Sequence, residues 1–294
     1  MFWLLIAIVA YFFLALSSLG DKVYLKGKEK PKLYVFYVGL LSGLVVLLIP
    51  FIKDFGLPPL DILIWPILEG IVYVLALYSM YYALDKYEVS VVVPAMGGLQ
   101  PVFIFFLSIG FFQITEISFK SVAALIILII GTFLISSNGK KIKANSKEFL
   151  FSLLPALLFA LDAILTKQVF MGESFFEGLV YMRITSFLVV LFFLFDKQLR
   201  KSLFKKRKRG VFLGAQAAGG VGILLQSYAI SLVPVLSLAT LNALKGVQYA
   251  FLLIITLFIS SFHSKILHEK FDKKTLRIKI ISVAIIALGI ALLM

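Results

Sequence analysis

The stretch AMGGLQPVF at residues 95–103 returns later in the chain as ALKGVQYAF at residues 243–251. Four of the nine positions are identical, and the Met/Leu and Leu/Val exchanges are conservative. Each copy lies within an apolar run that is long enough to cross a bilayer. The chain is therefore predicted to be a duplicated membrane unit. The two copies differ most at their third position, which is Gly97 in the first and Lys245 in the second.

The composition excludes a soluble protein. Hydrophobic residues make up 61% of the 294 positions, against about 45–50% in a typical globular domain. The absence of cysteine excludes disulfides and thiolate metal sites. The chain has no phosphate-binding loop motif and no Ser/His/Asp set, so neither an ATP-driven pump nor an enzyme is indicated. We therefore predict no catalytic residue and no metal site.

Ten apolar segments divide the chain into two similar halves, and all of them must be helical because lipid offers no partner to backbone polar groups. Residues 1–139 and 146–294 each hold five segments, and Leu33 and Tyr37 of the first half match Leu179 and Arg183 of the second. Because five is odd, the second half enters the membrane from the opposite side, which is the inverted repeat of many secondary transporters. The segments run about 2–20, 32–52, 61–84, 89–112, 118–137, 148–169, 177–195, 210–232, 234–260 and 276–293.

The basic residues predict the orientation. Of the 29 Lys and Arg residues, 24 lie in alternate links between segments and their adjoining turns, and only 3 lie in the other links. The positive-inside rule then places the basic links in the cytoplasm and both termini outside a cell (inner) membrane. The net charge of +14 is thereby assigned to topology and not to nucleic acid. Residues 1–14 carry no positive charge, so the first segment is expected to be a retained span.

Four ionisable residues lie within apolar segments, namely Glu69, Asp162, Arg183 and Lys245. Each would cost about 2.5–3.5 kcal/mol if it faced lipid, so all four are expected to face the bundle interior. Glu69, Asp162 and Arg183 share an outer layer, where they form either a structural Asp162–Arg183 pair or a gating or coupling network. Lys245 lies about 16 Å into its segment, near the midplane. It contacts a substrate or coupling ion there, or pairs with Glu69 or Asp162.

Polar residues accompany Lys245 on one helix face, because Asn242 and Gln248 are three positions away on either side. Gln100 lies one turn after Gly97 in the first copy, as Gln248 does after Lys245. These amides either contact a substrate or make hydrogen bonds between helices. The predicted substrate site comprises Lys245, Gln248, Asn242, Gln100, Gly97 and Tyr73, the deepest tyrosine of the third segment.

Several of these features resemble the EamA family of the drug/metabolite transporter superfamily. They are the ten spans in inverted halves, residues 97–103, Arg183 early in the seventh segment, and Glu116 and Glu269 before the fifth and tenth. The resemblance covers nearly the whole chain. It implies a basket of helices around a central cavity and the export of small metabolites by alternating access, without a cofactor. Familiar members have both termini in the cytoplasm, and a lysine in the ninth helix resembles the branches that carry phosphates and nucleotide sugars.

The resulting expectation is a secondary transporter for a small polar or amphipathic metabolite, such as an amino acid. Coupling to a proton on Asp162 or Glu69, exchange, and downhill movement all remain open. A carrier of phosphorylated or nucleotide-linked anions is the first alternative, and a non-transporting membrane scaffold is the second. The expected partners are a small-molecule substrate and the lipid bilayer, with no nucleic acid. Both a monomer and a homodimer fit the sequence.

Overall fold

In the computed structural model, every regular element of the described residues is a helix, as the apolar runs predict. The predicted boundary between the two halves, at 140–145, lies outside the described residues, and so do Glu116 and Glu269. The structure describes residues 2–25, 31–53, 55–87, 89–115, 117–136, 146–203, 209–262 and 273–293.

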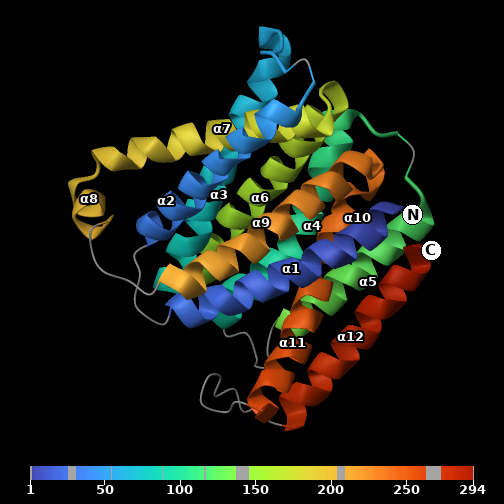
Figure 1. The fold of residues 1–294 in the computed structure, drawn as a ribbon. Helices are drawn as coiled ribbons and strands as arrows, with labels where there is room; N and C mark the ends of the chain where they lie inside the picture. Colours follow the sequence, from blue (N-terminus) through green and yellow to red (C-terminus); the bar gives the residue numbers. More distant parts are fainter. Residues whose placement is uncertain are drawn as a thin grey trace.

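The helices follow the predicted segments in order (Figure 1). The α-helices are α1 (Phe2–Leu25), α2 (Pro31–Ser42), α3 (Leu60–Lys86), α4 (Val89–Phe112), α5 (Phe119–Ser136), α6 (Ser146–Gly172), α7 (Phe175–Leu191), α8 (Lys197–Leu203), α9 (Arg209–Leu232), α10 (Leu238–Ala243), α11 (Lys245–Phe262) and α12 (Lys273–Leu293). Short 3₁₀ helices are η1 (Gly43–Phe51), η2 (Phe192–Phe195) and η3 (Val235–Ser237).

Eight helical stretches of the described residues are long and apolar enough to cross a membrane, so the chain is a multi-pass membrane protein. The predicted spans at 118–137 and 210–232 are also helical, as α5 and α9, but do not meet this criterion. The apolar run in α5 is shorter, and α9 is rich in glycine and carries two glutamines. The eight stretches are Phe2–Gly20, Pro31–Phe51, Leu60–Lys86, Ala95–Phe112, Phe151–Gly172, Phe175–Phe195, Val235–Phe258 and Lys274–Leu292.

The helices pack in a pattern that joins the two halves of the sequence. The first helix, α1, lies along α9 and also contacts α11, whereas α6 lies between α3 and α4. The last helices of the two halves, α5 and α12, pack on each other, and Figure 1 shows them side by side. The largest apolar core lies where α1, α5 and α10 meet, around the buried side chains of Tyr11, Leu128 and Leu241. A second core joins α2, α3 and α7.

Candidate functional site

The ninth apolar stretch is broken within the second copy of the repeated sequence. Helix α10 ends at Ala243, Leu244 forms a turn, and α11 begins at Lys245. The backbone N–H of Val247 donates to the carbonyl of Leu244 at 2.8 Å, so the Ala243 carbonyl loses the partner that a continuous helix would provide. The Thr132 hydroxyl of α5 donates to that carbonyl instead, at 2.9 Å. The break is therefore stabilised by a side chain from the other half of the chain.

Lys245 is the first residue of α11 and is half-buried. Its Nζ atom lies 5.7 Å from the centre of the Phe159 ring on α6. Among the described residues it has no ion pair and no hydrogen bond, so the predicted pairing with Glu69 or Asp162 is not formed. The N-terminus of a helix also carries a partial positive charge. The Lys245 side chain thus begins at the end of α11 that carries this partial charge.

The predicted amides hold helices together. Gln100 donates to the Asn242 side-chain oxygen at 3.3 Å and thereby joins α4 to α10. Asn242 donates in turn to the carbonyl of Leu238, one turn earlier in its own helix. Gln248 donates to the hydroxyl of Ser18 at 2.9 Å, which joins α11 to α1. These contacts match the alternative of hydrogen bonding between helices, although the Oε1 atom of Gln100 remains buried without a partner.

The two copies of the repeated sequence lie beside each other around Thr132. A Cβ atom added to Gly97 would lie 3.3 Å from the Thr132 methyl carbon and 3.6 Å from the ring of Tyr249. A Cβ atom added to Gly246 would overlap with the Thr132 hydroxyl. Because both glycines allow close approach to α5, the first copy and the second copy share one buried neighbourhood. Gly97 therefore lies near the break that presents Lys245.

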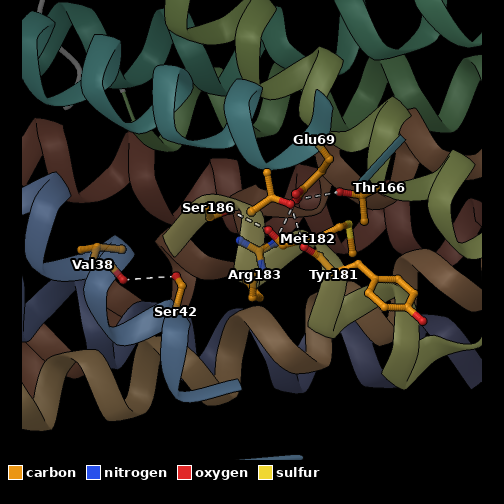
Figure 2. Close-up of polar contacts among 9 residues, drawn as sticks. Val38, Ser42, Glu69, Thr166, Tyr181, Met182, Arg183 and Ser186 are labelled. Carbon is orange, nitrogen blue, oxygen red and sulfur yellow. Dashed lines mark hydrogen bonds and ion pairs between the residues drawn. The ribbon is translucent and has the colours of Figure 1, made fainter. Parts of the chain in front are cut away.

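A separate cluster of charges joins α3, α6 and α7. Glu69 is fully buried, and Arg183 donates to its Oε1 atom at 3.0 Å. The Thr166 hydroxyl lies 3.5 Å from the same oxygen. Figure 2 shows Arg183 and Thr166 both directed at Glu69. The prediction of an Asp162–Arg183 pair is wrong, because the acid that Arg183 reaches is the fully buried one on α3.

Asp162 and Tyr73 complete this cluster. The Asp162 carboxyl lies within hydrogen-bonding reach of Glu69 and interacts electrostatically with Arg183. The Tyr73 ring stacks under the guanidinium, with 4.3 Å between its centre and the Arg183 Cζ atom. The structure thus brings together the three residues predicted to gate or couple transport. It places Tyr73 with them and apart from the amides around Lys245.

Three residues of these sites escaped sequence reasoning. Thr166 follows Asp162 by four positions, so it shares a helix face with Asp162, and this spacing could have revealed it. Tyr11 donates to the Leu241 carbonyl at 2.8 Å, and Thr132 supports the same break. Each is a polar side chain within an apolar run, which was the available signal. The carbonyls that accept from Tyr11 and Thr132 could not be predicted, because no helix-breaking residue marks the break in the sequence.

A surface pocket lies away from both clusters, at the end of the bundle where α2 and α8 begin and α3 ends. Lys32 and Asp196 face each other there at 2.8 Å. The hydrogen bond from Lys32 holds the pKa of the Asp196 carboxyl below its usual value, and backbone N–H groups of α8 add to this effect.

Comparison with known proteins agrees with the architecture. The family model of the EamA-like transporter family matches residues 1–137. A protein crystal structure has a TM-score of 0.70 over 99% of this chain and 96% of its own, at 14% identity, so it shares the fold. The sequence matches none of the curated proteins with which it was compared. The predicted resemblance is confirmed over residues 1–137, which match the model of this family, a domain of the drug/metabolite transporter superfamily.

Proposed function

We propose that this membrane transporter is a secondary transporter that moves a small polar or amphipathic metabolite outward by alternating access. Ten membrane helices, arranged as two inverted repeats of five, would surround the substrate path. The substrate carries one anionic group, such as a carboxylate, that Lys245 binds at the start of α11. Export follows from the family resemblance and not from the geometry of the site.

The unpaired Lys245 is the observation that carries this proposal. A buried or half-buried cation within a membrane protein is costly, and it is normally paired. Lys245 lacks such a partner among the described residues, although buried acids exist in the same bundle. A broken helix near the midplane is also a common place for substrate binding in transporters with inverted repeats. An anionic substrate group would supply the missing partner.

The packing supports the proposed inverted repeats. If each half contributes five helices, then α6 corresponds to α1, α3 to α9, and α4 to the α10–α11 stretch. The contacts of α1 with α9 and α11 then correspond to the contacts of α6 with α3 and α4. The second helix of each half also ends in a 3₁₀ turn, η1 after α2 and η2 after α7. A duplicated unit would produce both correspondences.

The charges favour a small metabolite over a phosphorylated or nucleotide-linked anion. Such anions are held best by two cations acting together. The other buried cations of the described helices are engaged: Arg183 by Glu69, Lys167 by the carbonyls of Ile230 and Ser231, and Lys279 by a partner of its own. A scaffold would need the amide contacts of Gln100 and Gln248 but would gain nothing from an unpaired lysine. The unpaired Lys245 therefore favours transport over both alternatives.

A direct test measures ligand binding and transport by the purified full-length protein. Thermal shifts against amino acids, sugar phosphates and nucleotides would identify the ligand class, and uptake into proteoliposomes would follow. We expect Lys245→Gln to weaken binding by about tenfold or more, since hydrogen bonds to charged groups contribute about 1.5–3 kcal/mol. Lys86→Gln, which changes an exposed lysine at the end of α3, should bind normally.

Unchanged affinity in Lys245→Gln would overturn the assignment of the anion to Lys245. Two further outcomes separate the alternatives. A shift with sugar phosphates or nucleotides alone would favour the carrier of phosphorylated anions. Ligand binding without any flux in proteoliposomes would favour a non-transporting protein. The preferred direction can be read from the same vesicles, by comparing uptake in populations of the two orientations.

A further inference from the structure

The cluster around Glu69 leads to an inference about what drives transport. We propose that Asp162 and Glu69 form a proton-binding site in which Asp162 carries the proton, and that release of this proton drives the conformational cycle. The inference rests on the proposed transport function for its coupling role. The proton site itself stands on the geometry of the described residues alone.

The two acids of this cluster lie close together and have no hydrogen-bond donor between them when both are ionised. The carboxyl groups of Asp162 and Glu69 lie within hydrogen-bonding reach, yet Asp162 Oδ1 and Glu69 Oε2 are both buried with no hydrogen-bond partner. An ionised carboxylate only accepts hydrogen bonds, so two of them cannot satisfy each other. One proton on the pair converts this contact into an O–H···O⁻ hydrogen bond. Each acid thus has a buried oxygen atom that such a bond could satisfy.

The charges of the surrounding helices leave the pair with one uncompensated negative charge. Arg183 on α7 is the cation that faces it, with Tyr73 from α3 and Thr166 from α6 as neutral neighbours. Helix α4, which packs on α6, has no titratable residue between 89 and 112. The other titratable side chains that the structure describes on these helices are Asp61, Tyr78, Tyr81, Tyr82, Asp85 and Lys86 on α3, Lys32, Tyr34 and Tyr37 on α2, Lys167 on α6, Glu177 and Tyr181 on α7, and Tyr228 on α9.

The geometry assigns the proton to Asp162. Arg183 donates to Glu69 at 3.0 Å, which stabilises the ionised form of that acid. Asp162 receives no hydrogen bond from Arg183, whose Nε and Nη1 atoms also lack partners. Glu69 is fully buried, and Asp162 is half-buried with its Oδ1 atom also buried. The proton is therefore assigned to Asp162, the acid to which Arg183 does not donate.

Release of the proton would change how α3 and α6 pack. These helices lie along each other, and the carboxyl pair bridges their seam. With the proton gone, two negative charges share one arginine at short range, and like charges at such a distance repel strongly. Separation of the helices would hydrate both carboxylates. In the first half, Tyr37 matches Arg183, and α1 has no acidic residue between Phe2 and Gly20, so the related seam carries no such charge.

Infrared spectroscopy of the purified wild-type protein tests the proton site without any substrate. We expect the carbonyl band of a protonated carboxyl to persist at neutral pH and to disappear as the pH is raised. Asp162→Asn should lack the band, and Asp61→Asn, which removes an exposed acid from the first turn of α3, should retain it. A wild-type spectrum without the band at neutral pH would overturn the proposal, even if the Asp162 variant could not be purified.

Proteoliposomes then test the coupling separately. A gradient of one pH unit should drive up to about tenfold accumulation of the substrate in the wild type for each proton moved. Asp162→Asn should still bind the substrate and exchange it, but it should no longer accumulate it. A protonated carboxyl without any substrate flux would leave the proton site intact and refute the transport function. Substrate accumulation by Asp162→Asn that still followed the pH gradient would refute the coupling and leave transport intact.

Discussion

Tyr11 of the first helix donates its hydroxyl hydrogen to the carbonyl oxygen of Leu241, 2.8 Å away and 230 positions later in the chain. Together with the bond from Thr132 to Ala243, it holds two carbonyls beside the break that precedes Lys245. An exposed backbone carbonyl within a membrane is tolerated only where protein or water satisfies it. The second half can therefore present Lys245 at the start of a helix because the first half supplies the donors.

The first prediction concerns these two donors. Tyr11→Phe and Thr132→Val should each lower the free energy of unfolding by about 1 kcal/mol, because each removes a buried hydrogen bond to a backbone carbonyl beside the break. Denaturant unfolding in detergent micelles would measure the loss. Tyr82→Phe removes a hydroxyl from an exposed side chain and should change little. A loss no larger than in this control would show that the break is stable without these bonds.

The second prediction concerns the ion pair of Arg183 and Glu69. Arg183→Met should destabilise the protein by about 3–5 kcal/mol, because it leaves a buried carboxylate uncompensated. Adding Glu69→Gln should recover much of this loss, since the unpaired charge is then removed. Denaturant unfolding of the two single variants and the double variant would give the coupling free energy. A double variant as unstable as Arg183→Met would indicate that packing, and not charge, dominates at this position.

Periodicity and charge were sufficient to predict the helical fold. The apolar runs mark each helix, because length and hydrophobicity alone decide whether a segment can cross a bilayer. The sequence also identified Glu69, Asp162 and Arg183 as one layer, from their depth along their segments. It did not identify which acid meets Arg183. That choice depends on the rotation of α3, α6 and α7 about their axes, and an all-apolar surface leaves the rotation undefined in sequence.

The broken ninth helix shows the other limit of sequence reasoning. The second copy of the repeat has no proline, so nothing local predicts a break between Ala243 and Lys245. The first copy contains Pro101 and yet lies in the continuous helix α4. The break is instead specified by tertiary contacts, from Tyr11 and Thr132, that lie far away in the chain.

The third prediction concerns the pH dependence of the Lys32–Asp196 contact. The pKa of Asp196 is held below its usual value of 3.8. The Lys32–Asp196 contact therefore stabilises the fold above about pH 3.8, and this stabilisation is lost as the pH falls through the lower pKa of the folded state. The melting temperature of the wild type should approach that of Asp196→Asn at acidic pH and exceed it slightly at neutral pH. A difference in melting temperature between wild type and Asp196→Asn that stayed constant from acidic to neutral pH would contradict this role of the Lys32–Asp196 contact.

The fourth prediction uses two glycines in corresponding apolar helices. A Cβ atom at Gly246 would overlap with Thr132 and lie 2.7 Å from the Ile286 side chain, whereas one at Gly110 would meet nothing within 4 Å. Gly246→Ala should therefore cost about 1–3 kcal/mol, as overpacked cores do. Gly110→Ala should stabilise its helix by up to about 1 kcal/mol, because alanine is the better helix former.

Unfolding of these two glycine variants in the same micelles makes the comparison direct. Because Gly246 follows Lys245, its replacement should also displace the start of α11 and weaken ligand binding together with stability. Gly110→Ala should leave binding unchanged. If Gly246→Ala were as stable as the wild type and bound ligand normally, the two copies of the repeat would not meet as closely around Thr132 as the structure places them.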